Sequence, residues 1–155
     1  MSLRQQLTDA MKEAMKAKDA KRLATVRLVL AALKDRDIAA RTETSRDLLG
    51  DDEILSLLAK MIKQRDESAV AFDSGNRPEL AAGEREEIAI IRSFMPAQMD
   101  EAGVQQAVKT VIAELGAASI KDMGKVMAAM KERYAGQMDF ARASGLVKDV
   151  LSAPK

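Results

Sequence analysis

Apolar residues recur every three or four positions along almost the whole chain, which is the spacing of amphipathic helices. No segment shows the sustained alternation of a β-strand. The stripes that we expect to face a core are Leu3, Leu7, Met11 and Met15 in a helix over about 2–17; Leu23, Val26, Leu30 and Leu33 in a helix over about 19–42; Ile54, Leu58, Met61, Ile62, Ala69 and Phe72 in a third helix from Asp51; and Ile88 and Ile91 in a fourth over about 78–93.

Capping and breaking residues give these helices their limits. Asp19 is a suitable N-cap for the second helix, and the polar stretch 43–49 with Gly50 predicts a loop. Gly75 predicts the end of the third helix, and Pro78 is a helix-start residue. Met95 precedes a proline and so avoids helical geometry, which predicts a domain boundary at Pro96.

Three shorter helices are expected beyond this point, over about 100–115, 122–135 and 139–152. Gly116 and Gly136 are the predicted stops between them, and Asp122 and Asp139 the predicted N-caps. The expected fold is all-α, with a four-helix N-terminal subdomain over 1–96 and a three-helix C-terminal subdomain over 97–155.

The composition limits the chemistry. The 155 residues include no His and no Cys. Ordinary acid–base catalysis near neutral pH, His-activated nucleophiles and the usual zinc ligand sets are therefore missing. We predict no catalytic residue, no metal site and no cofactor. The chain also shows no signal peptide and no apolar run of membrane-spanning length, so a cytoplasmic location without membrane contact is expected.

Positive charge concentrates in the first helical hairpin. Residues 1–42 hold ten Lys and Arg against five Asp and Glu, whereas residues 43–96 hold seven against twelve. Arg27, Lys34 and Arg41 recur every seven positions, which places them on one helix face about 10 Å apart from one to the next. A polyanion backbone fits such a row, but solvation of an outer face or pairing with acidic helices is the commoner explanation.

Further cations are candidates for phosphate contact. Lys63 and Arg65 lie in a dense polar cluster, and Arg65 borders the apolar stripe, so an ion pair within the bundle competes with a role in binding RNA. Lys125 and Lys131 lie on the predicted sixth helix. Gly124-Lys125 suggests a phosphate loop but fails the motif, because Ser119 and Val126 occupy positions that require Gly and a hydroxyl residue. Gly124 then permits close helix packing while Asp122 caps.

Four segments together resemble the YqeY family. They are TVRLVLAALKDRDIAA (25–40), KQRDESAVAFDSGNRPEL (63–80), EREEIAIIRSFMPAQMDEAGV (84–104) and KDMGKVMAAMKERYAGQMD (121–139). This family is similar to the C-terminal tail domain of GatB, the B subunit of the amidotransferase that acts on tRNA-bound amino acids. Positions that match the family pattern are Arg27, Lys34, Lys63, Gln64, Arg65, Glu67, Ser68, Gly124, Lys125, Gly136 and Asp139; departures are Asp66, Phe94-Met95 and Phe140.

The resemblance implies a helical subdomain followed by a small GatB-tail-like one, and a link to glutamine-dependent tRNA amidation. In the whole amidotransferase the chemistry lies elsewhere and the tail helps to hold tRNA. A family label of carbon–nitrogen ligase with glutamine as amide donor is therefore expected, although no nucleophile–base pair is visible in this chain.

Three functions follow as hypotheses. The first is a non-catalytic tRNA-binding module whose RNA contacts include Arg27, Lys34, Arg41, Lys63, Arg65, Lys125 and Lys131, with Gly124, Gly136 and Asp139 as motif residues. Three Phe, one Tyr and no Trp do not suffice for a base-stacking platform, so such a module would read RNA shape and backbone. The second is a helical adaptor that docks an aminoacyl-tRNA synthetase or an amidotransferase subunit. The third is a stand-alone amidotransferase.

Overall fold

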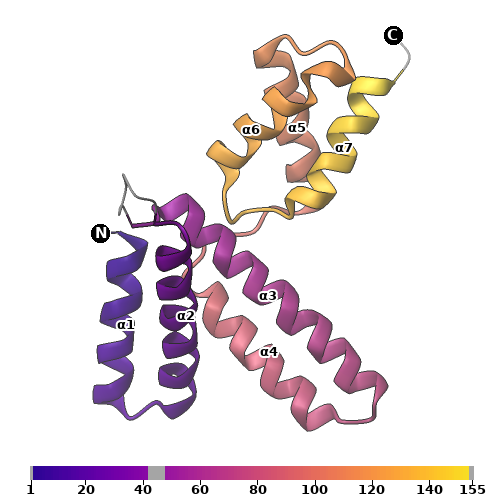
Figure 1. The fold of residues 1–155 in the computed structure, drawn as a ribbon. Coiled ribbons are helices and arrows are strands. Elements are labelled where there is room, and N and C mark those ends of the chain that lie inside the picture. Colours follow the sequence, from indigo (N-terminus) through magenta and orange to yellow (C-terminus); the bar gives the residue numbers. More distant parts are fainter. Residues whose placement is uncertain (1, 42–47, 154–155) are drawn as a thin grey trace. The chain divides into compact units, whose positions relative to one another are not determined.

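The computed structural model describes residues 2–41 and 48–153, so the predicted loop over 43–49 lies mostly outside the described residues. Within them the chain is all-α, as the sequence predicts, and contains no strand (Figure 1). The helices are α1 (Leu3–Ala17), α2 (Ala20–Ala39), α3 (Asp51–Ser74), α4 (Pro78–Arg92), α5 (Glu101–Leu115), the short 3-10 helix η1 (Ile120–Asp122), α6 (Met123–Tyr134) and α7 (Phe140–Ser152).

By its internal packing the chain divides into two compact units, Met1–Met95 and Pro96–Lys155. In the first unit α1 pairs with α2 and α3 pairs with α4, while α2 also packs against α4 (Figure 1). In the second unit α5, α6 and α7 each contact the other two. Each unit has a hydrophobic core of its own.

The core of the first unit joins all four of its helices. Leu58 of α3 and Ile91 of α4 are fully buried against Leu7 of α1 and Leu33 of α2. A second link joins α2 to the end of α4, where the Arg22 guanidinium lies 5.0 Å from the centre of the Phe94 ring and donates to the Ser93 hydroxyl at 3.3 Å. The two helical hairpins therefore form one packed body.

The core of the second unit is built from small and flexible apolar side chains, including Val111, Val126, Met130 and Val147, all of which are fully buried. The segment that enters this unit is fixed by two hydrogen bonds. The Met99 N–H donates to the Gln137 carbonyl at 2.9 Å, and the Gln98 amide donates to the Gly136 carbonyl.

Several predicted helix limits are confirmed. Asp19 caps α2 by accepting from the Arg22 N–H at 3.1 Å, and Asp139 caps α7 by accepting from the Ala141 N–H at 2.9 Å. Gly116 ends α5 with φ of 64°, and Gly136, two residues after α6, has φ of 76°. Both glycines adopt a left-handed conformation that side chains with a Cβ avoid.

The turn between α3 and α4 differs in detail from the prediction. Gly75 caps α3 as expected, but its φ is −84°, and the left-handed residue is Asn76 with φ of 59°. Asparagine tolerates this conformation better than other residues that carry a Cβ. All residues from 73 to 80 are exposed, so this turn forms the free end of the α3–α4 hairpin.

Two predictions about the first hairpin are wrong. Met15 is 50% exposed, whereas Ala10 and Ala14 are buried in its place. A spacing of four residues rotates each side chain by about 40° around the helix, so a stripe of this spacing leaves the core after a few steps. Helix α2 ends at Ala39, earlier than the predicted position near residue 42. The prediction missed this end because no glycine or proline in the sequence marks it.

A partly buried ion pair joins the start of α1 to the end of α2. The Arg4 guanidinium of α1 donates two hydrogen bonds to the Asp37 carboxylate of α2, at 2.8 and 2.9 Å, and a third to the Leu49 carbonyl at 3.2 Å. The same carboxylate accepts from the Leu49 N–H at 3.1 Å. Nearby, the Leu3 N–H at the start of α1 donates to Asp51 at the start of α3.

Replacing Arg4 by Ala should destabilise the first unit by about 3 kcal/mol, because the side chain of Asp37 is only 8% exposed and would keep a charge without its partner. Hydrogen exchange followed by mass spectrometry checks this, with protection falling in α1 and α2 but not in α5, α6 and α7. Lys16→Ala on the exposed side of α1 is the matched control and should change stability by less than about 0.5 kcal/mol. Equal protection in Arg4→Ala and the wild type would contradict the prediction.

The same carboxylate makes the first unit sensitive to acid. Hydrogen bonding by Arg4, reinforced by the Leu49 N–H and opposed by burial, lowers the pKa of Asp37 below its ordinary value of 3.8. Because the pKa of Asp37 is lower in the folded than in the unfolded protein, the ionised carboxylate stabilises the fold fully above pH 3.8. This stabilisation is lost as the pH falls through the pKa of Asp37 in the folded protein. The Asp37→Asn variant should be less stable than the wild type at pH 7, and the difference should shrink below about pH 4.

Urea unfolding followed by the methyl NMR signals of Val29 and Leu33 measures this difference in the first unit alone. Asp35→Asn, at an exposed position of the same helix, serves as the control and should keep the wild-type pH dependence. A constant difference between Asp37→Asn and the wild type from pH 7 to pH 3 would show that another group is responsible.

Candidate nucleic-acid interface

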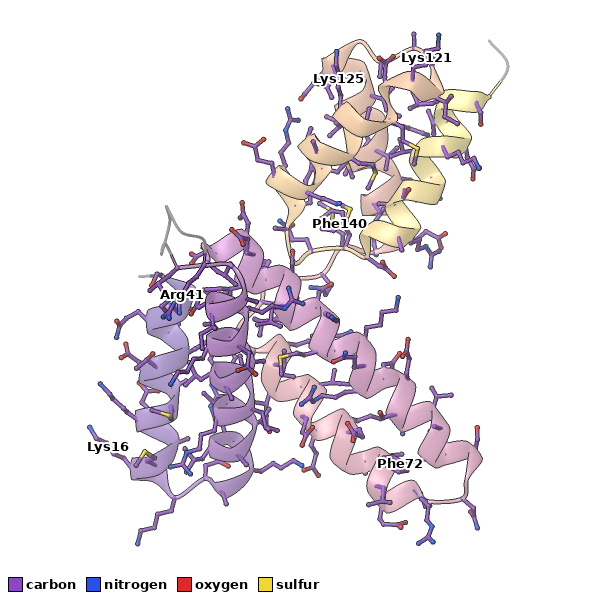
Figure 2. The ribbon with its side chains drawn as sticks, in the orientation of Figure 1. Lys16, Arg41, Phe72, Lys121, Lys125 and Phe140 are labelled. Carbon is purple, nitrogen blue, oxygen red and sulfur yellow. The ribbon has the colours of Figure 1, made fainter. Side chains whose placement is uncertain are left out.

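Three exposed lysines lie on η1 and α6. Lys121 lies in η1 and Lys125 in the first turn of α6, and Lys131 follows six residues later, about 120° around the helix from Lys125. Figure 2 shows the side chains of Lys121 and Lys125 at the same end of the second unit, directed away from it. Among the described residues, no carboxylate oxygen lies within 4.0 Å of any of the three ammonium groups.

Gly124, Ala128 and Glu132 lie between Lys125 and Lys131 on the exposed side of α6, because they recur every four residues. A Cβ built at Gly124 would meet nothing within 4 Å. The prediction that Gly124 permits close helix packing is therefore wrong, since no neighbouring helix approaches it. The open position instead leaves the backbone of the first turn of α6 accessible to a molecule bound by the lysines.

Asp122 has a different role from the one its position suggests. Its side chain makes no capping hydrogen bond to α6. The carboxylate instead accepts from the N–H groups of Ala118 and Ser119 at 3.0 and 3.3 Å, in the turn before η1. These two backbone bonds, and then the charge of Lys125, lower the pKa of Asp122. Asp122 thus fixes the turn that presents Lys121, rather than the helix that follows.

The motif residues Gly136 and Asp139 both have structural roles in the second unit. Gly136 is buried, and its left-handed backbone presents the carbonyl that accepts from Gln98. Asp139 caps α7. Both shape the connection from α6 to α7.

The predicted basic row on α2 is shorter than expected. Arg27 and Lys34 are exposed on α2, but Arg41 follows the end of the helix, where its N–H donates to the Ile38 carbonyl at 3.2 Å. The charge of Arg41 also contributes to the lowered pKa of Asp37. The structure therefore keeps Arg27 and Lys34 on one helix face and places Arg41 outside it.

The two candidates on α3 have different environments. Lys63 is exposed. Arg65 is only 16% exposed, donates to the Glu87 carboxylate of α4 at 2.9 Å, and donates to the Met61 carbonyl at 3.2 Å. Lys21 of α2 lies 3.6 Å from the other oxygen of Glu87. Arg65 thus takes part in an ion-pair network that joins α2, α3 and α4.

Sequence reasoning did not include Lys121 or the Arg4–Asp37 pair among its site residues. Lys121 precedes Lys125 by four positions, a spacing that places both on one side of a helix and would have identified it. No sequence signal indicates that Arg4 and Asp37 meet, because they are 33 residues apart on different helices.

Replacing Gly124 by Ala should stabilise the second unit by up to about 1 kcal/mol, because the position is helical, open and without a positive φ. Gly145→Ala is the matched comparison, since a Cβ there in α7 also meets nothing within 4 Å. Thermal unfolding of both variants checks the expectation. A lower melting temperature for Gly124→Ala alone would indicate a steric constraint at that glycine.

No group of three or more His, Cys, Asp or Glu side chains among the described residues is placed to hold a metal ion. None of the described helices combines the length and the apolar character that a bilayer crossing requires. The described residues form an all-helical chain of two compact units, with Lys121, Lys125 and Lys131 exposed on η1 and α6.

This chain belongs to the YqeY family. The model of the family described as Yqey-like protein matches residues 4–151, which is nearly the whole chain. The resemblance found in the sequence is thereby confirmed.

The chain is also similar to yeast proteins named "Altered inheritance of mitochondria protein 41, mitochondrial". Identity is 29% over 85 residues for Candida glabrata, covering 55% of this chain and 45% of that protein. It is 32% over 108 residues for Lachancea thermotolerans, covering 68% and 55%, and 33% over 94 residues for Clavispora lusitaniae, covering 59% and 52%. The chain thus spans about half the length of these curated relatives.

Proposed function

We propose that this protein is a non-catalytic tRNA-binding accessory module and that its RNA contact lies on the exposed side of η1 and α6. One observation carries the proposal: Lys121, Lys125 and Lys131 are exposed around the open backbone at Gly124, without a carboxylate of any described residue within ion-pair distance. The three-helix unit that holds them corresponds, in the proposal, to the GatB-tail-like subdomain.

The surface favours a phosphate backbone over bases. Lysines contact phosphates as point charges, and small residues between them let a backbone approach the helix. The aromatic rings do not offer a stacking platform: Phe72, Phe94, Tyr134 and Phe140 are all half-buried. A folded RNA recognised by shape suits this surface better than a single strand.

The proposal assigns no catalysis to this chain. The module would assist a separate enzyme that carries out glutamine-dependent tRNA amidation, and in this way it would serve translation. Any carbon–nitrogen ligase activity belongs to that enzyme. We place the protein in the cytoplasm, as its sequence predicts, whereas the curated yeast relatives carry the word mitochondrial in their names.

Binding of unmodified tRNA transcript, measured by fluorescence anisotropy from 50 to 300 mM salt, tests the proposal. The wild type should bind with a strong salt dependence. The triple variant Lys121→Ala/Lys125→Ala/Lys131→Ala should bind at least about tenfold more weakly, with a salt slope smaller by about 2 to 3. Absence of binding by the wild type at the lowest salt would overturn the proposal.

The matched control is Lys109→Ala/Lys148→Ala, which removes two exposed lysines from the same unit. Its affinity should fall by no more than about threefold, since long-range charge is screened over about 10 Å at these salt concentrations. Equal losses in the two variants would mean that net charge, not the α6 surface, governs binding. The contribution of the remaining candidate residues to tRNA affinity is measured with the variants Arg27→Ala/Lys34→Ala and Lys63→Ala.

A second candidate function is a helical adaptor that docks an aminoacyl-tRNA synthetase or an amidotransferase subunit. One observation favours it: α2 exposes large apolar side chains, Leu28 at 48% and Ile38 at 49%, on the side away from its core. Recovery of such an enzyme on the purified protein after nuclease treatment, and its loss in Leu28→Glu, would support this function.

A further inference from the structure

Helix α2 is apolar on two sides. Its inner side places Val26, Val29 and Leu33 in the core of the first unit, where they are fully buried. Its outer side carries Ala24, Leu28, Ala31 and Ile38, all of which are exposed. A helix that is apolar on both sides is typically buried on both. The outer side of α2 thus has the composition of an interface.

The outer residues follow the spacing of a helix-pairing seam. Positions 24, 28, 31, 35 and 38 alternate steps of four and three, which keeps them in one stripe along the helix. Asp35 is the only charged member of the stripe. Arg27 and Lys34 each directly precede a seam residue, so both lie along the same edge of the stripe. In a paired helix, this edge sets the charge preference for the partner.

We infer that the outer face of α2 docks an amphipathic helix of another protein that carries carboxylates along its edge. The apolar stripe supplies the contact, Ala24 and Ala31 allow the helices to approach closely, and Arg27 and Lys34 select an acidic edge by charge complementarity. Asp35 favours a basic or polar residue at the matching position, which fixes the register. The inference rests on the adaptor function proposed above, whose partner chemistry it specifies, and it does not depend on tRNA binding.

A second copy of this chain fits the face poorly. In an antiparallel pair related by a two-fold axis, identical edges meet, so Arg27 would lie near Lys34 of the second copy. In a parallel two-fold pair, the seam residue Asp35 would face its own counterpart. Both arrangements bring like charges together in a contact that excludes water, which is unfavourable.

An RNA backbone also fits poorly. Contact with phosphates would cover Leu28 and Ile38 with a charged surface and gain nothing from their apolar area. The α6 surface differs, because Gly124 and Ala128 between its lysines expose little apolar area. The cations of α2 and those of α6 therefore suit two different ligands.

Fluorescence anisotropy with a synthetic helical peptide of about three heptads tests the inference. The acidic probe carries Leu at its seam positions and Glu along its edges, and a second probe carries Lys in place of Glu. Full-length wild-type protein should bind the acidic probe at least about tenfold more tightly than the basic one. Leu28→Glu and Ile38→Glu should each weaken binding about tenfold or more, since each removes a buried apolar contact.

Val70→Glu is the matched control, because Val70 is a similarly exposed apolar residue on α3, at 56%. Its affinity should stay within about twofold of the wild type. Arg27→Glu/Lys34→Glu should reverse the preference and favour the basic probe, and Asp35→Leu should bind both probes more tightly. Circular dichroism verifies that each variant is folded, which is expected because the substituted side chains are exposed.

Three outcomes would overturn the inference: no binding of the acidic probe by the folded wild type, equal loss in Val70→Glu and Leu28→Glu, or no reversal in the charge-swapped variant. Sedimentation showing a dimer that Leu28→Glu dissociates would assign the face to a second copy instead. Loss of tRNA affinity in Arg27→Ala/Lys34→Ala equal to that of the α6 triple variant would assign it to RNA. Failure of tRNA binding alone, with peptide binding intact, would overturn only the proposed function.

Discussion

A carboxylate and a guanidinium join three helices of the first unit, where α1 begins and α2 ends. Arg4 lies on α1, Asp37 on α2, and Leu49 in the segment that leads into α3. This one cluster therefore connects three helices. The Asp37 carboxylate is largely removed from water, and a charge so placed stabilises a fold only when its hydrogen bonds are complete. Four hydrogen bonds converge on the Asp37 carboxylate and the Arg4 guanidinium. Helix α3 begins two residues after Leu49, and the Leu3 N–H donates to Asp51 in its first turn, so these contacts place the start of α3 beside the start of α1.

The fold class and the helix positions were accessible from the sequence because they depend on local periods and caps. Asp19, Asp139 and Gly116 act within a few residues of themselves, and their predicted roles are confirmed. Predictions failed where the deciding contact is distant or missing. Met15 follows an apolar period yet is exposed, and Gly124 has no neighbour to pack against. Both outcomes depend on what other helices place around the residue, which the neighbouring residues in the sequence do not show.

The candidate site could be predicted only in part for the same reason. Arg27, Lys34, Lys63, Lys125 and Lys131 are exposed in the structure, but the sequence does not show what surrounds a cation in space. Arg65 meets Glu87 from another helix, Arg41 leaves the helix that would align it, and Lys121 joins Lys125. The neighbours on other elements, not the residue type, separate structural cations from available ones.

The free end of the α3–α4 hairpin has a practical consequence. Residues 73 to 80 are all exposed, and Asn76 already adopts the left-handed conformation of a tight reversal, so the chain turns there without core contacts. Such a position accepts inserted sequence and is accessible to proteases. A reporter or affinity tag inserted between Gly75 and Asn76 would therefore offer an attachment point for immobilising the folded protein without touching the core of the first unit.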